Sequence, residues 1–300
     1  MTDHVLTLVA GGLSPRLETE QVEAVRMALK NLGAYVGRPK WLAANLACDI
    51  EFAELHADQA DAAARPALAG GVIDVFAQIL DGRRKKLLLA DMESTLIQNE
   101  MLDELADFVN LRKEIAEITA RAMNGELDFE GAIDARVALL KDLPASTLEE
   151  SAKRIVYTPG ASALAQTMKR HGAATAIVSG GFDFFTAMVR DHLGFDRDFA
   201  NRLIIEHGRI AGHVARPILG RQAKYDTLVR LAAENGLDLS ATVTVGDGAN
   251  DLDMLLAAGL GVAYHAKPAV AAAAKWRVEH GDLTALLYAQ GYTQQDMVLE

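Results

Sequence analysis

The chain has 300 residues and half of them are hydrophobic, which provides a packed core and excludes an intrinsically disordered protein. This length exceeds one typical domain of about 100 to 200 residues, so we expect two domains. The 30 basic and 41 acidic side chains give a formal net charge of −11, which argues against a general nucleic-acid-binding or anionic-membrane surface.

Several features predict a soluble, cytoplasmic protein. The single cysteine, Cys48, has no partner for an internal disulfide, which fits a reducing compartment. Residues 1–10 lack a basic leader, and their apolar run is too short for a signal peptide. The longest low-charge stretch, residues 255–274, contains His265 and Lys267, so we expect no membrane-spanning segment.

The first eighty residues alternate between short strands and amphipathic helices. Strands are expected at residues 5–10 and 46–55, and helices at residues 18–32 and 58–68. Residues 72–80 are apolar and ambiguous between strand and helix. The order β-α-β-(β)-α-β is typical of a small ferredoxin-like α+β domain, which we place at residues 1–80.

A charged linker at residues 81–86 precedes a different pattern. Short apolar runs follow it at residues 87–90, 173–178, 203–206 (in a hairpin-like stretch) and 241–245. Continuous apolar strands that alternate with helices indicate a parallel sheet covered on both faces, so residues 81–300 are expected to form an α/β domain. Ligands bind beyond the carboxyl ends of the strands in such sheets.

An insertion is expected after the first strand of this sheet. Asp91 and Ser179 both follow apolar runs, yet 88 residues separate them, whereas a βαβ unit takes roughly 30 residues. The intervening segment has helical periodicity over residues 104–143. We expect a helical cap at about residues 104–156, standing over the strand ends.

Two carboxylates, Asp91 and Glu93, lie just past the first apolar run. One carboxylate can attack an electrophile while the other moves a proton, and attack of aspartate on phosphorus gives an aspartyl-phosphate. The alternative interpretation is that Asp91 caps the next helix.

Two further positions suit a phosphate group. Ser179 and Gly180 offer a hydroxyl and exposed backbone N–H groups at a strand end, although Ser-Gly-Gly is also ordinary turn chemistry. Lys224 opens a helix, where the helix dipole disfavours its charge, so a partner such as phosphate or the nucleophile is one interpretation. A solvated surface lysine is the other.

The strongest local pattern is residues 246–251, Gly-Asp-Gly-Ala-Asn-Asp, directly after a buried strand. The carboxylates of Asp247 and Asp251 are hard oxygen ligands with small neighbours, which suits Mg²⁺. An Asx turn that starts a helix is the structural alternative. The carboxylate pair, the Ser-Gly-Gly stretch, Lys224 and the 246–251 motif all lie at the end of a strand or the start of a helix in one α/β domain. Together they favour phosphate chemistry.

These elements resemble the four motifs of the haloacid dehalogenase-like phosphatase superfamily, and most closely those of its phosphoserine phosphatases. The resemblance covers residues 87–292 and includes further stretches that are specific to that subfamily: Asn99-Glu100, Phe129, Arg136, residues 137–144, 178–182, 265–268 and 280–287. It implies a Rossmann-like core with a helical cap. Residues 1–80 resemble the divergent ACT-type module of many bacterial members.

The resemblance also implies roles for single residues. Asp91 would be the nucleophile and a Mg²⁺ ligand, and Glu93 the general acid, which offers its backbone carbonyl to the metal. Ser179, Gly180 and Lys224 would bind the phosphoryl oxygens, and Asn250 would contact the phosphate. Asp247 and Asp251 would bind the metal. In the cap, Glu100 would bind the substrate ammonium, Arg136 would bind its carboxylate, and Phe129 would pack over the closed site. The implied reaction is hydrolysis of O-phosphoserine, the last step of serine biosynthesis.

One position departs from the family pattern, because most phosphoserine phosphatases have Asp where this chain has Glu93. The extra methylene moves the carboxyl by about 1.5 Å, and acid–base catalysis is sensitive on that scale. A related phosphoserine–homoserine phosphotransferase resembles this chain at the position, so phosphoryl transfer to an alcohol stays open. Another small-molecule phosphatase and a catalytically silent amino-acid-binding protein are further alternatives. ACT-type modules often associate through their sheets, so a homodimer is a hypothesis.

Overall fold

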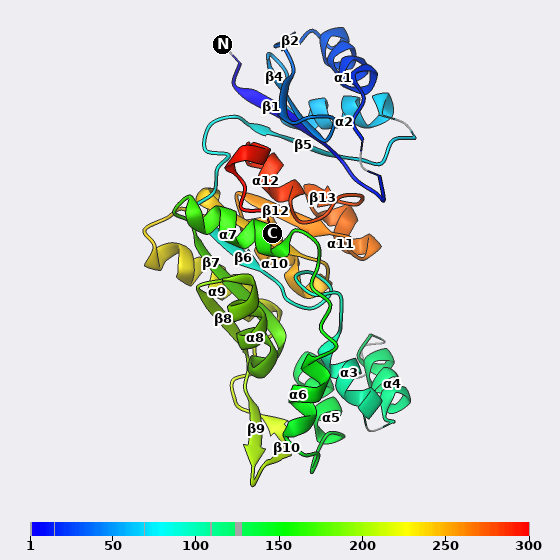
Figure 1. Ribbon diagram of the computed structural model, residues 1–300, viewed down its shortest axis with the longest axis vertical. Helices are drawn as coiled ribbons and strands as arrows, with labels where there is room; N and C mark the ends of the chain where they lie inside the picture. The colour runs from blue at the N-terminus through cyan, green and yellow to red at the C-terminus, as the bar shows by residue number, and fades with distance from the viewer. Residues whose placement is uncertain (1, 15, 69, 109, 124–127, 300) are drawn as a thin grey trace.

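The structure is a computed structural model that describes residues 2–14, 16–68, 70–108, 110–123 and 128–299. Its ribbon is elongated, with a small N-terminal unit at one end, a parallel sheet in the middle and a group of helices at the other end (Figure 1). Within the described residues, no helix is long and apolar enough to cross a membrane.

The N-terminal unit has the order βαβββαβ, which is the expected β-α-β-(β)-α-β order with one further short strand. Its sheet order is β2-β4-β1-β5, with β3 also paired to β4, and β1 runs antiparallel to both β4 and β5. The ambiguous residues 72–80 form an edge strand. The elements are β1 (His4–Ala10), α1 (Thr19–Asn31), β2 (Tyr35–Val36), β3 (Lys40–Ala43), β4 (Ala47–Ala53), α2 (Ala57–Ala67) and β5 (Ile73–Ile79).

Both faces of this small sheet are buried. Helices α1 and α2 cover one face, where Val25 and Ala64 pack with Leu6 and Ile50. On the other face, Phe76 joins the hydrophobic core of the larger unit. The N-terminal unit is therefore packed against the rest of the protein through its sheet.

The larger unit is built on a six-stranded, all-parallel sheet of order β13-β12-β11-β6-β7-β8. Its strands are β6 (Leu87–Ala90), β7 (Ala174–Phe182), β8 (Arg197–Asn201), β11 (Thr242–Gly246), β12 (Leu260–Tyr264) and β13 (Trp276–Val278). The helices around it are α7 (Ala161–Arg170), α8 (Asp183–Leu193), α9 (Arg221–Glu234), α10 (Leu252–Ala257), α11 (Pro268–Ala273) and α12 (Ala285–Ala289). This arrangement confirms the predicted α/β fold.

Strand β6 shows why the predicted strands are continuously apolar. Leu87 and Leu89 pack with Leu228 of α9, whereas Leu88 and Ala90 belong to the core cluster that includes α7, α8 and α12. Because side chains alternate along a strand, a strand with helices on both faces has no polar side.

The prediction that residues 203–206 belong with the sheet strands is wrong, although their hairpin-like character is confirmed. They form β9 (Leu203–Glu206), which pairs antiparallel with β10 (Arg209–Val214) in a separate hairpin. Positive φ angles of 50° at His207 and 75° at Gly208 make the tight turn between the two strands. The hairpin contacts the cap, where the N–H of Asp142 donates to Ile210 O at 2.9 Å.

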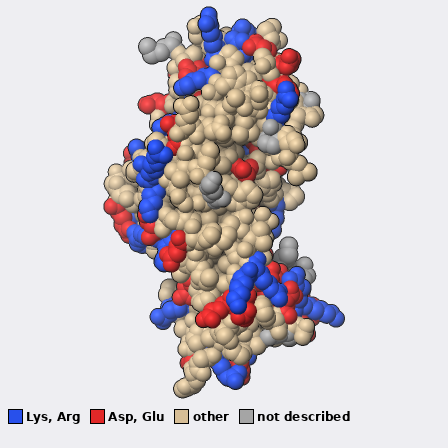
Figure 2. Space-filling view, in the orientation of Figure 1, with Lys and Arg blue, Asp and Glu red and all other residues tan. Residues whose placement is uncertain are grey.

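Among the described residues, four helices lie between β6 and α7: α3 (Met101–Phe108), α4 (Arg112–Met123), α5 (Phe129–Ala138) and α6 (Ser146–Ala152). They form the helical insert that the sequence predicts and lie at the end of the molecule away from the N-terminal unit (Figure 1). Figure 2 shows acidic and basic side chains close together in this region. Among them are the ion pairs of Arg112 with Asp107 and Arg154 with Glu104, at 2.6 and 3.2 Å.

Candidate active site

Three of the predicted site residues meet at one edge of the parallel sheet. Asp91 directly follows β6, and Asp247 directly follows β11, its parallel neighbour, with Ala90 level with Val245. The N–H of Asp91 continues this pairing and donates to Val245 O at 3.0 Å. Ser179 lies near the end of β7, on the other side of β6. Parallel strands end at the same edge, which brings together residues up to 156 positions apart.

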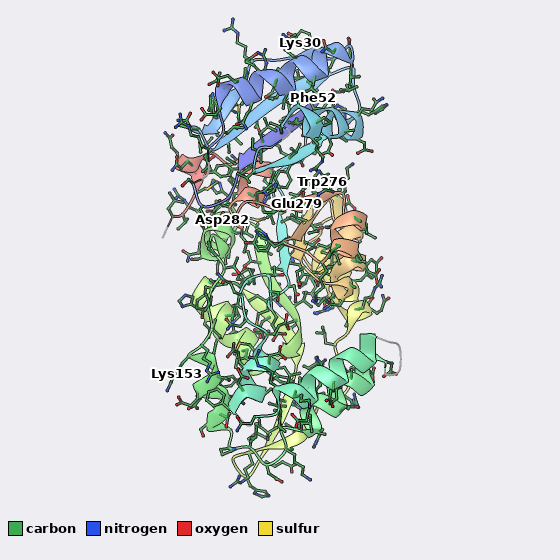
Figure 3. All side chains as sticks on the ribbon, turned by 90° about the vertical axis from the view of Figure 1, so that its right-hand side faces the viewer. Lys30, Phe52, Lys153, Trp276, Glu279 and Asp282 are labelled. Carbon is green, nitrogen blue, oxygen red and sulfur yellow. The ribbon has the colours of Figure 1, made fainter. Side chains whose placement is uncertain are left out.

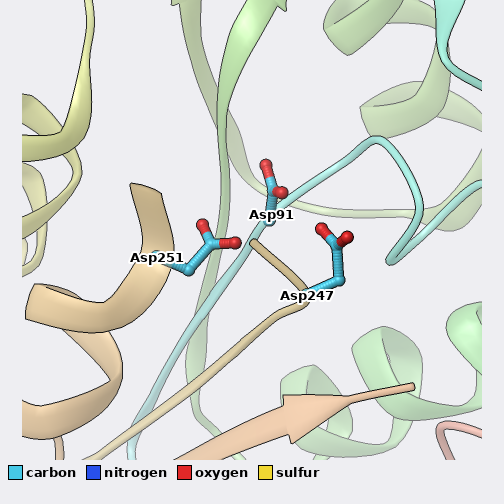
Figure 4. Close-up of side chains that lie close together, drawn as sticks. All are labelled: Asp91, Asp247 and Asp251. Carbon is cyan, nitrogen blue, oxygen red and sulfur yellow. The ribbon is translucent and has the colours of Figure 1, made fainter. Parts of the chain in front are cut away.

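Asp91, Asp247 and Asp251 form a carboxylate cluster (Figure 4). One oxygen from each lies within 4.8 Å of the others. Asp251 ends the short helix η2 (Ala249–Asp251), and its Oδ2 accepts the N–H of Gly248 at 2.9 Å. A Cβ on Gly246 would lie 2.4 Å from Asp251 Cγ, so glycine is required where the strand ends. Three convergent carboxylates are a suitable ligand set for a hard divalent cation.

Lys224 is a buried cation in contact with this cluster. It is 1% exposed, and its Nζ lies 2.7 Å from Asp91 Oδ1 and 2.6 Å from Asp251 Oδ1. Helix α9 carries this side chain inward beneath the strand ends. The lysine therefore has a carboxylate partner on either side, and its surface interpretation is wrong.

Burial dominates the electrostatics of these groups. It raises the pKa of Asp91 well above its ordinary value, the charge of Asp251 adds to this rise, and Lys224 opposes it. Burial alone would lower the pKa of Lys224, but the two carboxylates raise it overall. Burial raises the pKa of Asp247 to about 6, against the effect of Lys267. A divalent cation among these carboxylates would relieve their repulsion, so the residues present fit a metal ion.

Glu93 is not one of the three clustered carboxylates and has contacts of its own. Its Oε1 accepts the N–H of Met101 at 2.8 Å, at the start of the cap. A Cβ on Gly181 would lie 2.8 Å from Glu93 Oε2, so the carboxylate lies directly against that glycine. Burial, followed by the charge of Glu100, raises the pKa of Glu93 to about 7, against the Met101 hydrogen bond. A carboxyl group with such a pKa can both donate and accept a proton near neutrality.

Ser179 and Gly180 belong to an irregular stretch of β7 rather than to a turn after it. The Ser179 Oγ accepts the N–H of Gly181 at 2.9 Å, and the pairing of β7 with β8 shifts register between Val178 and Phe182. Glycines are common at such irregular positions, where some backbone groups are not paired with the neighbouring strand and can make other contacts.

Sequence reasoning missed Asn201, which supports this stretch. It is 2% exposed at the end of β8, and its Nδ2 donates to Gly180 O at 2.8 Å. Its Oδ1 accepts the N–H of Leu219 at 2.7 Å, just before α9. Asn201 thus links the Ser179–Gly180 stretch to the helix that carries Lys224. Only its place at the end of a strand could have signalled it, and that strand has no continuous apolar run.

The cap residues face the same region. Glu100 is exposed and accepts a hydrogen bond from Ser94 Oγ at 2.7 Å. Arg136 is half-buried on α5, where burial lowers its pKa and the nearby charges of Glu93 and Glu100 oppose that effect. The positive charge of Arg136 and the negative charge of Glu100 are therefore both close enough to Glu93 to shift its pKa.

Two predicted positions add less. Asn250 is half-buried, and a Cβ on Gly248 would lie 2.3 Å from its Oδ1, so the second glycine of the motif makes room for this amide. Phe129 begins α5, but its side chain lies outside the described part of the chain.

Comparison with known proteins agrees with this site. Residues 88–256 match the family model described as haloacid dehalogenase-like hydrolase. Over 285 residues the chain is 41% identical to a phosphoserine phosphatase of Streptomyces coelicolor, covering 94% of this chain and 70% of that protein.

Two solved structures are also similar. A haloacid dehalogenase family hydrolase from Salmonella enterica serovar Typhi has a TM-score of 0.83 and 27% identity, covering 96% of this chain and 98% of that one. A phosphoserine phosphatase solved as a phospho-aspartyl intermediate analogue has a TM-score of 0.63 and 42% identity, covering 68% of this chain and 98% of that one.

A parallel sheet with a helical insert after its first strand, and carboxylates at the strand ends, defines a hydrolase of this class. The chain belongs to the haloacid dehalogenase-like hydrolase family. Within that family, the relatives that it matches at about 40% identity are phosphoserine phosphatases.

Proposed function

We propose that this protein is a Mg²⁺-dependent phosphoserine phosphatase that hydrolyses O-phosphoserine through a phosphorylated Asp91. The observation that carries the proposal is the position of Asp91, whose carboxylate contacts Lys224 Nζ and clusters with the carboxylates of Asp247 and Asp251. The identity to phosphoserine phosphatases supports the substrate.

The first step transfers the phosphoryl group to the enzyme. An oxygen of Asp91 attacks phosphorus, the bond between phosphorus and the serine oxygen breaks, and Glu93 donates a proton to the leaving oxygen. In the second step a water attacks the phosphorus of the aspartyl-phosphate. Glu93 takes a proton from that water, and inorganic phosphate leaves as Asp91 is regenerated.

The other residues hold charge in place. Lys224, Ser179 and the N–H of Gly180 bind the phosphoryl oxygens, and Asn250 supports them. When bound at Asp91, Asp247 and Asp251, with the backbone carbonyl of Glu93, Mg²⁺ supplies electrostatic stabilisation of the phosphoryl group. Phosphate monoester hydrolysis is among the slowest uncatalysed reactions, so the enzyme combines these effects with covalent catalysis.

The cap recognises the amino-acid part of the substrate. Arg136 binds the substrate carboxylate, because a guanidinium forks onto a carboxylate, and Glu100 binds the substrate ammonium. Phe129 packs over the closed site. The burial of the two side chains supports these two roles. Arg136 is half-buried and held in place, whereas Glu100 is exposed and open to an incoming ligand.

For the chain as a whole, we propose an ACT-like module at residues 1–80 and a phosphatase domain at residues 81–300, with the cap at about 104–156. The antiparallel sheet of the N-terminal unit, with two helices between its strands, supports the first part. We also propose that the protein is cytoplasmic and forms a homodimer through that module. Light scattering of the full chain tests the dimer.

The decisive experiment measures phosphate release from O-phosphoserine in the presence of Mg²⁺. We expect turnover by the wild type and its abolition in Asp91→Asn, because the amide is not a nucleophile. Asp253→Asn, which removes one partner of a surface ion pair with Arg221, is the matched control and keeps full activity. Full activity of Asp91→Asn would overturn the assignment of the nucleophile, and formation of phosphohomoserine on adding homoserine would indicate a phosphotransferase.

A further inference from the structure

Asp74 of the N-terminal unit holds a segment of the larger unit by its backbone. This carboxylate, on β5, is 2% exposed. Its Oδ1 accepts the N–H groups of Glu279 and His280 at 2.8 and 3.2 Å, and its Oδ2 accepts the N–H of Gly281 at 2.8 Å. Three successive N–H groups on one carboxylate make a strong, directional attachment.

The end of β1 holds the same segment from another direction. The N–H of Gly12 donates to His280 O at 2.8 Å, and a Cβ on Gly11 would lie only 2.1 Å from the carbonyl carbon of His280. Figure 3 shows Glu279 and Trp276 at the boundary between the two units. The indole N–H of Trp276 donates across this boundary to Ala77 O at 3.0 Å.

From this segment, contacts lead to the carboxylate cluster. The ring Nε2 of His265 lies 2.9 Å from Gly281 O, and the N–H of His265 donates to Val278 O at 2.9 Å. Two residues later, the N–H of Lys267 donates to Asp247 O at 3.2 Å, and its Nζ lies 3.9 Å from Asp247 Oδ2. The path from Asp74 to Asp247 thus has two bridging segments, residues 279–281 and 265–267.

Packing alone does not hold residues 265–267. His265 and Lys267 are exposed, and His265 has a φ of 40°, an uncommon conformation for a residue other than glycine. A cavity of about 260 Å³ lies beside them, lined by Ala263, His265, Ala266, Ala271, Arg277, Val278 and Glu279. A segment beside a cavity has fewer packing contacts, so its hydrogen bonds determine its position.

We propose that Asp74 is a positioning residue for Asp247: through residues 279–281 and 265–267, the N-terminal unit sets the place of one carboxylate of the metal site. The expected effect on phosphoserine hydrolysis rests on the proposed function. The structural part of the inference, the effect on metal affinity, does not depend on which substrate is used.

The experiment compares Asp74→Asn with Asp49→Asn in the full chain. Asp49 is a matched control, because it is 1% exposed in the same sheet and pairs with Thr7 and Arg83 at 2.6 Å, away from residues 279–281. Binding of Mn²⁺ is followed by the electron paramagnetic resonance signal of the free ion, without substrate. Thermal unfolding of each variant is measured alongside.

We expect Asp74→Asn to weaken Mn²⁺ binding about 3- to 10-fold, the range typical of coupling through a contact network. The Mg²⁺ concentration that gives half-maximal phosphoserine hydrolysis rises by a similar factor, while KM for phosphoserine at saturating Mg²⁺ stays unchanged. Asp49→Asn lowers the melting temperature and leaves metal affinity unchanged. Equal metal affinity of the two variants would overturn the proposal.

A second variant tests the path itself. His265 is exposed, and asparagine tolerates its positive φ, so His265→Asn keeps the fold while removing the contact to Gly281. It is expected to weaken Mn²⁺ binding as Asp74→Asn does, with no further loss in the double variant. Additive losses would overturn the shared path. If the wild type binds Mn²⁺ but does not hydrolyse phosphoserine, the proposed function fails while the Mn²⁺ comparison still decides the role of Asp74.

Discussion

The carboxylate of Glu93 lies directly against the backbone of Gly181: a Cβ added there would lie 2.8 Å from Glu93 Oε2. Glu93 lies just after β6, and Gly181 belongs to the neighbouring strand β7. The proposed general acid therefore depends for its position on Gly181, which lies beside Ser179 and Gly180.

Replacing Gly181 with alanine should displace the Glu93 carboxyl group. We expect kcat to fall about 10- to 100-fold, because acid–base geometry fails when a group moves by about 1 Å. The KM for phosphoserine should change less. Gly37→Ala is the control, since its Cβ would meet Glu51 O at 3.3 Å, far from the site. Steady-state kinetics measures both, and an unchanged kcat in Gly181→Ala would contradict the assignment of Glu93.

Glu93→Asp tests whether this site is adapted to the longer side chain. Aspartate draws the carboxyl group back by about 1.5 Å, which removes the contact with the N–H of Met101. We expect turnover to fall about 10-fold, although the resemblance to phosphoserine phosphatases implies aspartate at this position. The measurement is kcat with and without homoserine as acceptor, and Glu234→Asp, a surface residue paired with Arg197, is the control. Turnover equal to that of the wild type would show that Glu93 and Asp are interchangeable here.

Mg²⁺ should stabilise the folded protein, because Asp91, Asp247 and Asp251 repel one another without a metal. At a free concentration 100 times its dissociation constant, a ligand adds about 2.7 kcal/mol to the free energy of unfolding. Chelator-treated protein should therefore melt at a higher temperature on adding Mg²⁺. The rise should be much smaller in Asp251→Asn and undiminished in Asp253→Asn. The same rise in both variants would place the stabilising ion elsewhere.

Cys48 should be unreactive in the folded protein. It is fully buried, and burial raises the pKa of its thiol to about 12, so the thiol stays protonated at pH 8. A chromogenic disulfide reagent should label it only on unfolding. Because the folded pKa lies above the unfolded one, this group's contribution to stability is lost as the pH rises from about 9 toward 12. Rapid labelling of native protein at pH 8 would contradict the burial, and Cys48→Ala gives the background.

Much of the site could be predicted because its signals are local. An apolar run that ends in Asp91 or Asp247 marks a buried strand and its carboxyl end, and parallel strands end at a common edge. The hairpin at residues 203–206 shows the limit of this reasoning. Its apolar residues could have faced a sheet or a partner strand, and only the turn at Gly208 and the packing against the cap decide between them.

By itself, the sequence predicted the α/β fold, the helical insert and the common edge of the sheet where Asp91, Ser179 and Asp247 lie. These depend on apolar periodicity and short motifs, which act over a few residues. The tertiary structure alone decided that Lys224 lies between Asp91 and Asp251, that Asn201 supports Gly180, and that Asp74 holds Glu279 from 205 positions away. No spacing signals such contacts, because they form only when separately folded elements pack together and bury polar groups that must then find partners.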